Sequence, residues 1–218
     1  MINKLKRAIH YKLRRPKEIY YDVLFDTFIK RDYRFLLENI KPNTIALDIG
    51  AYIGDTAIFL ASHPYIKKVY SYEANRQLYN IAVKNIESSG LENKIELNNK
   101  AITIHGESTA FYNVNDVTPA GKIDTGMTQV PACSLQDILK NLEGNIIMKM
   151  DIEGAEHQIF ERLFPKDIKK ISKMQIEYHD LWTLPEDLNY LGFDYRIIKA
   201  DVNNSIYDEI GMIYAQRR

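Results

Sequence analysis

Short apolar runs alternate with longer segments of helical period from Thr44 to the end of the chain. Short apolar runs bounded by turn residues are typical of buried strands, and the longer segments have the spacing of amphipathic helices. We predict strands at about 44–49, 68–73, 94–98, 145–150 and 173–178. We predict helices near 55–62, 75–88, 134–141, 154–163 and 185–191. This alternation indicates an α/β fold in which helices cover both faces of a mostly parallel sheet.

Two segments depart from the alternation. Residues 108–135 hold two β-like runs around a polar loop that contains proline and glycine, which predicts an antiparallel flap. The last two runs, 193–199 and 211–217, are joined without a helix long enough for a crossover, so we expect an antiparallel hairpin at the sheet edge. The prediction is therefore a doubly wound, mostly parallel, seven-stranded sheet with an antiparallel C-terminal hairpin.

The first forty residues stand apart from this pattern. Ile2, Leu5, Ile9 and Leu13 recur at helical spacing among basic residues, and no acidic residue precedes Glu18. Such a helix can rest weakly on a membrane surface through residues 1–17, or it can pack its apolar stripe on the domain, which is the more common arrangement. We divide the chain into an N-terminal helical extension over 1–40 and one α/β domain over 41–218.

Charge and cysteine content narrow the function classes. The 29 basic and 29 acidic residues balance, but the basic N-terminal segment leaves the body acidic, which argues against a nucleic-acid partner. Cys133 is the one cysteine, so no internal disulfide can form, and no cysteine and histidine spacing is typical of zinc. No apolar run typical of a secretory signal follows the N-terminal charges. We expect a cytoplasmic protein.

A glycine-containing turn follows the first predicted strand, in the segment TIALDIGAYIGDTAIFLA (44–61). Glycines at such a turn let the backbone approach a ligand closely, and the free N–H groups of the next helix favour an anionic group. In a dinucleotide site the middle glycine meets a pyrophosphate, whereas Tyr52 occupies that place here. Asp48 suits a positively charged group, such as the ammonium of an amino acid. The turn thus favours a cofactor that carries an amino acid.

Glu73 ends the second predicted strand, 25 residues after Asp48. A carboxylate in this range commonly accepts two ribose hydroxyls, although an acid here could equally cap the following helix. Together with the glycine turn, ligand binding is the favoured interpretation. Asn98 and Asn99 follow the third strand, where an amide could contact adenine or simply form a turn.

Six motifs then resemble, in order and spacing, those of the FkbM-type methyltransferases: DIGAYIGDTA (48–57), YEAN (72–75), NKAI (99–102), SLQDIL (134–139), KMDIEGAE (149–156) and IEYH (176–179). The resemblance covers roughly residues 40 to 217. It implies a Rossmann-like class I fold, S-adenosylmethionine as cofactor, and methyl transfer to a hydroxyl of a sugar, glycolipid or natural product.

The resemblance also implies roles for single residues. Asp48, Gly50 and Gly54 would hold the methionine part of the cofactor, Glu73 its ribose, and Asn99 with its neighbours would flank adenine. Asp151 and Glu153 would lie beside the reactive methyl. The positions implied to line the cofactor are Asp48, Gly50, Ala51, Tyr52, Gly54, Asp55, Glu73, Ala74, Asn99, Lys100, Ala101 and Asp151.

Candidate catalytic residues lie at the ends of the fourth and fifth predicted strands. Side chains two apart on a strand share a face, so Lys149 lies beneath Asp151, and Glu177 beneath His179. If these strands are adjacent, Lys149 can pair with Glu177 while Asp151 and His179 converge above them. We hypothesise that Asp151 or His179 is the base. His179 could instead only end its strand, and Glu153 could only favour the dipole of the next helix.

Three alternatives remain open. A divalent metal on Asp151, Glu153 and His179 suits the ligand types, but no metal is expected because methyl transfer does not require one. A nicotinamide-dependent oxidoreductase is disfavoured by Tyr52 and by the terminal hairpin. A domain that binds the cofactor or a partner without catalysis is the other alternative.

The flap loop 114–127, with Lys122, Asp124 and Thr125, is expected to line the acceptor pocket.

Overall fold

The structure is a computed structural model that describes residues 33–103, 109–113, 127–199 and 210–218. The basic helix predicted over residues 1–17 and the flap-loop residues Lys122, Asp124 and Thr125 lie outside this part of the chain. Among the described residues, no helix is both long and apolar enough to cross a membrane.

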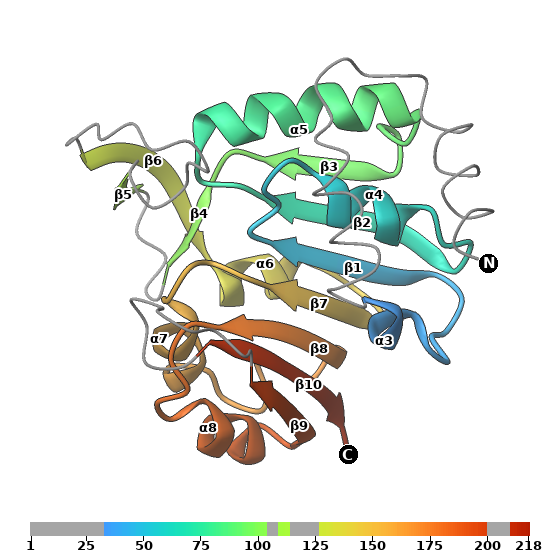
Figure 1. Ribbon diagram of the computed structural model, residues 1–218. Coiled ribbons are helices and arrows are strands. Elements are labelled where there is room, and N and C mark those ends of the chain that lie inside the picture. Colours follow the sequence, from blue (N-terminus) through green and yellow to red (C-terminus); the bar gives the residue numbers. More distant parts are fainter. Residues whose placement is uncertain (1–32, 104–108, 114–126, 200–209) are drawn as a thin grey trace.

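One seven-stranded sheet forms the centre of the fold, with the strand order β3-β2-β1-β7-β8-β10-β9 (Figure 1). Neighbours from β3 to β8 pair in parallel, and β10 runs antiparallel to both β8 and β9. The predicted α/β fold and its C-terminal hairpin are therefore confirmed. The strands are β1 (Thr44–Ile49), β2 (Ile66–Tyr72), β3 (Ile95–Asn98), β7 (Ile146–Met150), β8 (Ile171–Tyr178), β9 (Phe193–Lys199) and β10 (Gly211–Arg217).

The strand order reverses at β1, because β2 and β3 extend to one side of it and β7 and β8 to the other. In open α/β sheets, ligands bind outside the carboxyl ends of the strands at such a switch point. Figure 1 shows the carboxyl ends of β1, β2, β7 and β8 along one edge. This edge carries the residues that the sequence singled out.

A second, three-stranded sheet lies beyond that edge (Figure 1). It contains β4 (Ala101–Thr103), β5 (Thr109–Asn113) and β6 (Met127–Ser134), with β6 in the middle. β5 and β6 pair antiparallel, which confirms the predicted flap, and β4 pairs parallel with β6.

Helices cover both faces of the large sheet. They are α3 (Arg34–Leu37), α4 (Asp55–Ala61), α5 (Arg76–Ser89), α6 (Leu135–Asn141), α7 (Glu156–Glu161) and α8 (Leu184–Tyr190). Successive strand residues point to opposite faces. Leu47 and Met148 accordingly enter a core with residues of α6, α7 and α8, whereas Ala46 and Ile147 enter a second core with residues of α3, α4 and α5.

The segment just before β1 packs into the second core. Leu36 and Ile40 are buried there, and Lys173 Nζ donates hydrogen bonds to the carbonyls of Phe35 (3.1 Å) and Glu38 (2.6 Å). Residues 33–40 thus pack on the sheet, while the proposed division of the chain at residue 40 stays a prediction.

The start of helix α7 differs from the prediction for a local reason. Helix α7 begins at Glu156, two residues later than the predicted start at 154. Glu153 and Gly154 adopt positive φ angles of 61° and 109°, which a right-handed helix cannot contain. The two residues instead form a turn between β7 and α7.

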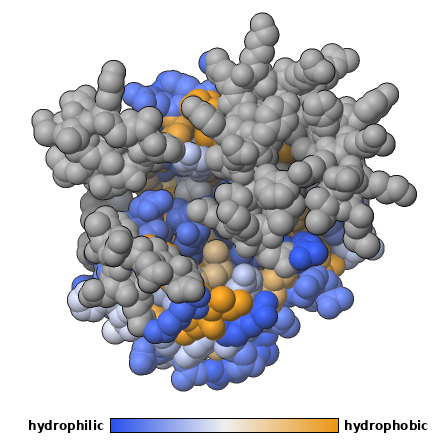
Figure 2. Space-filling model, viewed as in Figure 1, coloured by the Kyte–Doolittle hydropathy of each residue, from blue (hydrophilic) through white to orange (hydrophobic). Residues whose placement is uncertain are grey.

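The edge strand β9 exposes apolar side chains. Tyr195 is 39% exposed and Ile198 is 50% exposed. Figure 2 shows hydrophobic residues gathered toward the lower part of the viewed face, where Figure 1 places β9, β10 and α8.

Candidate functional site

The turn after β1 is fixed by backbone hydrogen bonds. The N–H groups of Gly50 and Ala51 donate to the carbonyl of Tyr72 over 3.0 and 2.9 Å, and Gly54 N–H donates to the carbonyl of Ala51 over 2.8 Å. Gly50, Tyr52 and Gly54 have positive φ angles of 80°, 51° and 83°. The side chains of Ala51 and Asp55 are buried, so the turn is packed against the domain on one side.

The two glycines are required for packing within the protein. A Cβ atom on Gly50 would lie 1.7 Å from the carbonyl oxygen of Asp151, and one on Gly54 would lie 3.2 Å from the Cβ of Ala82 in α5. Asp151 and α5 thus occupy the space on the Cβ side of these two glycines. The close approach of the turn backbone to a ligand stays a prediction.

Glu73 directly contacts the glycine turn. Its Oε2 accepts a hydrogen bond from Tyr52 N–H (2.7 Å), and its Oε1 accepts one from Asn75 N–H (2.8 Å). The cap of α5 is Asn75, whose Oδ1 accepts from Gln77 N–H and Leu78 N–H. Burial raises the pKa of Glu73 to about 7, although the two backbone hydrogen bonds act to lower it. Glu73 therefore links the turn to β2 rather than capping the helix.

Asn99 holds the segment that follows Glu73. Its Nδ2 donates to the carbonyls of Glu73 (2.8 Å) and Ala74 (3.0 Å), while Arg76 Nη1 donates to its Oδ1 (3.1 Å). Lys100 beside it is exposed, and Ala101 begins β4 and is half-buried. The residues expected near adenine are thus gathered next to Glu73, with the Asn99 amide bound to backbone.

A buried polar row crosses the sheet beneath the turn. In the strand registers, Ser71, Asp48, Lys149 and Gln175 stand side by side on β2, β1, β7 and β8, and all four are buried. Ser71 Oγ donates to Asp48 Oδ2 over 2.7 Å. Lys149 Nζ lies 3.8 Å from Asp48 Oδ1 and donates to the carbonyl of Gly50. Burial raises the pKa of Asp48 to about 6, although Lys149 and Ser71 act to lower it.

Lys149 has two acidic partners next to this row, and its predicted pair with Glu177 stays a prediction. The ion pairs described for Lys149 join it to Asp48 and to Asp151, whose Oδ2 lies 3.7 Å away. In the strand register, Gln175 is the neighbour of Lys149 on β8, and Glu177 comes two residues later. The cationic partner that we expected a ligand to offer Asp48 is thus supplied by Lys149.

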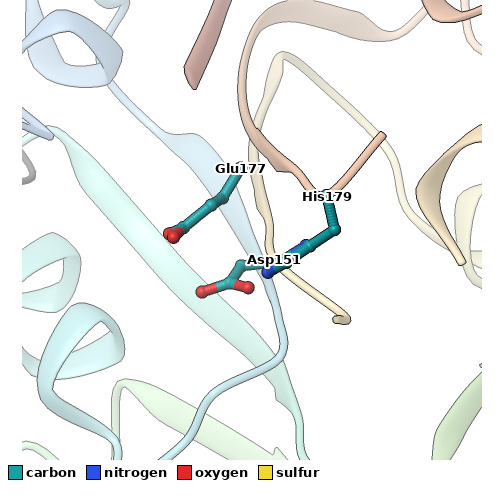
Figure 3. Close-up of side chains that lie close together, drawn as sticks. All are labelled: Asp151, Glu177 and His179. Carbon is teal, nitrogen blue, oxygen red and sulfur yellow. The ribbon is translucent and has the colours of Figure 1, made fainter. Parts of the chain in front are cut away.

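Asp151, Glu177 and His179 point toward one another (Figure 3), and one potential ligand atom from each lies within 4.8 Å of the others. The predicted convergence of Asp151 and His179 is confirmed. From the sequence we assigned Glu177 to a pair with Lys149 and not to this cluster. Glu177 and His179 are two residues apart and so share a face of the strand, and this spacing could have identified Glu177 as a member of the cluster.

Two glutamates contact His179. Glu153 Oε2 lies 3.2 Å from its Nε2, and Glu156 Oε1 lies 3.4 Å from its Nδ1. Burial by itself lowers the pKa of His179, but hydrogen bonds and charges of Glu153 and Glu156 outweigh it and raise the pKa to about 10. His179 therefore keeps a proton at neutral pH. Glu156 was missed because an acid at a helix start is common for other reasons.

Comparisons with known proteins come from sequence and from solved structures. The profile of the methyltransferase FkbM domain matches residues 48–196. Methyltransferase FkbM from Methylobacillus flagellatus KT has a TM-score of 0.56 and 18% identity to this chain, over 84% of this chain and 46% of that one. A candidate rRNA methylase from Clostridium thermocellum has a TM-score of 0.52 and 10% identity to this chain. The match covers 87% of this chain and 97% of that one.

At these identities the two structures are evidence for the fold. The chain spans less than half the length of the Methylobacillus flagellatus protein. No curated protein matches the chain significantly.

Proposed function

The chain belongs to the FkbM methyltransferase domain family, and on that premise we propose that it transfers the methyl group of S-adenosylmethionine to a hydroxyl of a small molecule, such as a sugar, a glycolipid or a natural product. The observation that carries the proposal is the contact between the glycine turn and Glu73, at 2.7 Å from Tyr52 N–H. This hydrogen bond joins the turn that would hold the methionine part of the cofactor to the residue that would hold its ribose.

The charges of this edge fit that cofactor. Glu73 and Asp151 are carboxylates, which suit a positively charged ligand group and ribose hydroxyls and would repel a pyrophosphate. Each oxygen of a carboxylate can accept more than one hydrogen bond, so Glu73 retains acceptor capacity for ribose beyond its two backbone bonds. The turn residues Gly50, Ala51, Tyr52 and Gly54, the first helical residue Asp55, and the segments Glu73–Ala74 and Asn99–Ala101 would surround the ligand.

When bound, S-adenosylmethionine supplies an electrophilic methyl carbon. The protein has to hold the acceptor oxygen roughly 3 Å from that carbon, on the side opposite the sulfur, and to keep water out. Asp151 follows β7 at the same edge, and Lys149 at 3.7 Å stabilises the charge of its carboxylate. We assign Asp151 as the acceptor of the hydroxyl proton.

His179 has a different part in this proposal. Because its pKa is raised to about 10, it carries a proton at neutral pH and cannot take one from the acceptor. It would instead place a positive charge and a donor beside Asp151, oriented by Glu153 and Glu156. Asp151 is thus favoured over His179 as the base.

The test is transfer of a labelled methyl group. The protein is incubated with labelled S-adenosylmethionine and a panel of sugars, glycolipids and phenolic natural products, and products are identified by mass spectrometry. We expect label on one acceptor class, and a loss of about 10²–10⁴-fold in rate for Asp151→Asn. Glu92→Gln, an exposed change before β3, is the control and should keep the full rate.

Two outcomes would count against the proposal. A full rate in Asp151→Asn would remove Asp151 as the base. Binding of S-adenosylmethionine with no label on any acceptor would favour the alternative function, a domain that binds the cofactor without catalysis.

A further inference from the structure

The ends of β7 and β8 bring two carboxylates and one imidazole together. Asp151 directly follows β7, whose last residue Met150 pairs with Ile176, the residue before Glu177, and His179 comes two residues after Glu177. One oxygen or nitrogen from each lies within 4.8 Å of the others, and the three side chains point toward a common place (Figure 3). Such a mixed set of oxygen and imidazole ligands is typical of sites for divalent ions such as Mn²⁺.

We propose that Asp151, Glu177 and His179 bind a divalent cation. The inference deepens the proposed function and rests on it for the role of the ion, though not for its binding. A divalent ion polarises an oxygen atom bound to it. An ion at this place would therefore hold the acceptor hydroxyl beside Asp151 and lower the pKa of that hydroxyl.

Glu156 supplies an independent observation for this site. In metal sites, the imidazole nitrogen that does not bind the ion usually donates to a carboxylate, which fixes the tautomer and the ring orientation. Glu156 Oε1 lies 3.4 Å from Nδ1 of His179. Glu156 is itself 1% exposed, and its carboxylate accepts hydrogen bonds from Ile152 N–H (3.0 Å) and Gly154 N–H (3.1 Å). A buried carboxylate that is itself held by two backbone hydrogen bonds thus lies beside this nitrogen.

This arrangement selects Nε2 as the ligand atom. Nδ1 lies on the side of Glu156, and Nε2 faces Glu153, whose side chain is 54% exposed and lies 3.2 Å away. Binding of the ion would release the Nε2 proton to solvent. Glu153 is exposed enough to turn away or to join as a further oxygen ligand.

The local charge also favours a cation. Lys149 lies on the other side of Asp151, between that carboxylate and Asp48, at 3.7 and 3.8 Å. This one lysine is outnumbered by the carboxylates around the cluster, which are Asp48, Asp151, Glu153, Glu156 and Glu177. Close carboxylates of this kind repel one another, and a divalent ion would relieve that repulsion.

The experiment is a titration of the full chain with Mn²⁺, in which the free ion is measured by electron paramagnetic resonance. We expect one tight site per chain. Glu177→Gln and His179→Gln should each weaken binding at least about tenfold, and Glu156→Gln, which leaves all three ligands in place, should weaken it about 10–100-fold. Glu92→Gln should bind as the wild type does. Circular dichroism and thermal unfolding check that each variant is folded.

Binding of Mn²⁺ by the wild type that is no tighter than binding by Glu177→Gln or Glu156→Gln would overturn the inference. Calorimetry with S-adenosylmethionine on the same samples separates the two proposals. A protein that binds S-adenosylmethionine but not Mn²⁺ refutes the cation site alone. A protein that binds Mn²⁺ but not S-adenosylmethionine refutes the proposed function alone.

Discussion

Tyr52 and Glu73 are joined by a hydrogen bond of 2.7 Å, from the backbone N–H of the first to Oε2 of the second. Tyr52 has a φ angle of 51°, which a residue with a side chain adopts at a cost of order 1 kcal/mol or more. The hydrogen bond stabilises that conformation and ties the turn after β1 to the end of β2. Two segments that are 21 positions apart thus form one surface.

The raised pKa of Glu73 should make the free energy of unfolding depend on pH. Burial raises its pKa from 4.5 to about 7, so the folded chain keeps a proton that the unfolded chain has released between these values. The free energy of unfolding should therefore fall as the pH rises from about 4.5 to about 7, by at most about 1.4 kcal/mol per pH unit from this group. Urea unfolding at several pH values measures the slope.

In Glu73→Gln, the free energy of unfolding should fall less steeply with pH than in the wild type. Asp48, whose pKa is raised to about 6, contributes a fall of the same sign at lower pH, so the two proteins should differ most clearly between pH 6 and 7. Equal slopes in the wild type and Glu73→Gln would show that Glu73 is ionised in the folded protein throughout this range.

Gly50→Ala should destabilise the protein by about 2–4 kcal/mol, because the new Cβ would meet the Asp151 carbonyl at 1.7 Å and the φ angle of 80° is strained for alanine. Gly90→Ala is the matched control, since its φ angle is 70° and nothing lies within 4 Å of its Cβ position. It should cost only about 1–2 kcal/mol. Equal losses for the two variants in urea unfolding would mean that the close approach of Asp151 is relieved at little cost.

Lys149→Met should destabilise the protein by about 3–5 kcal/mol, since it leaves Asp48 buried without its nearby cation. Adding Asp48→Asn should restore part of the loss, because the buried negative charge is then also gone. A double-mutant cycle by urea unfolding measures the coupling. Additive losses would show that Lys149 and Asp48 do not stabilise each other.

Asn99→Ala should weaken binding of S-adenosylmethionine and reduce stability by about 1–3 kcal/mol. The side chain donates two hydrogen bonds to the backbone at Glu73 and Ala74, and each is worth about 0.5–1.5 kcal/mol. Arg76→Ala removes only the exposed bond to Asn99 Oδ1 and should cost less than about 1 kcal/mol. If Arg76→Ala is as damaging as Asn99→Ala, the amide does not hold this segment.

Much of the fold was predictable from the sequence. The apolar runs around Leu47 and Met148 predicted buried strands, and the last two runs predicted the hairpin of β9 and β10, because the connection between them is too short for a helical crossover. Periodicity determines which residues lie on which face, and with the adjacency of β7 and β8 it brings Asp151 and His179 together.

Contacts that depend on register could not be predicted. Lys149 meets Asp48 because β7 pairs with β1 at that level, and Gln175 instead of Glu177 stands beside it on β8. Sequence spacing gives the face of a strand but not the offset between two strands. The positive φ angle of Gly154, which delays the start of α7 and allows Glu156 to reach back toward His179, was equally hidden.

The central claim is that the glycine turn and Glu73 bind S-adenosylmethionine, and calorimetric titration of the full chain with this ligand tests it most directly. We predict one site per chain in the wild type and in Glu92→Gln, no binding of NAD, and an affinity about 10–100-fold lower in Glu73→Gln, which weakens hydrogen bonds from ribose to a charged acceptor. Absence of binding to the wild type, or an unchanged affinity in Glu73→Gln, would contradict it.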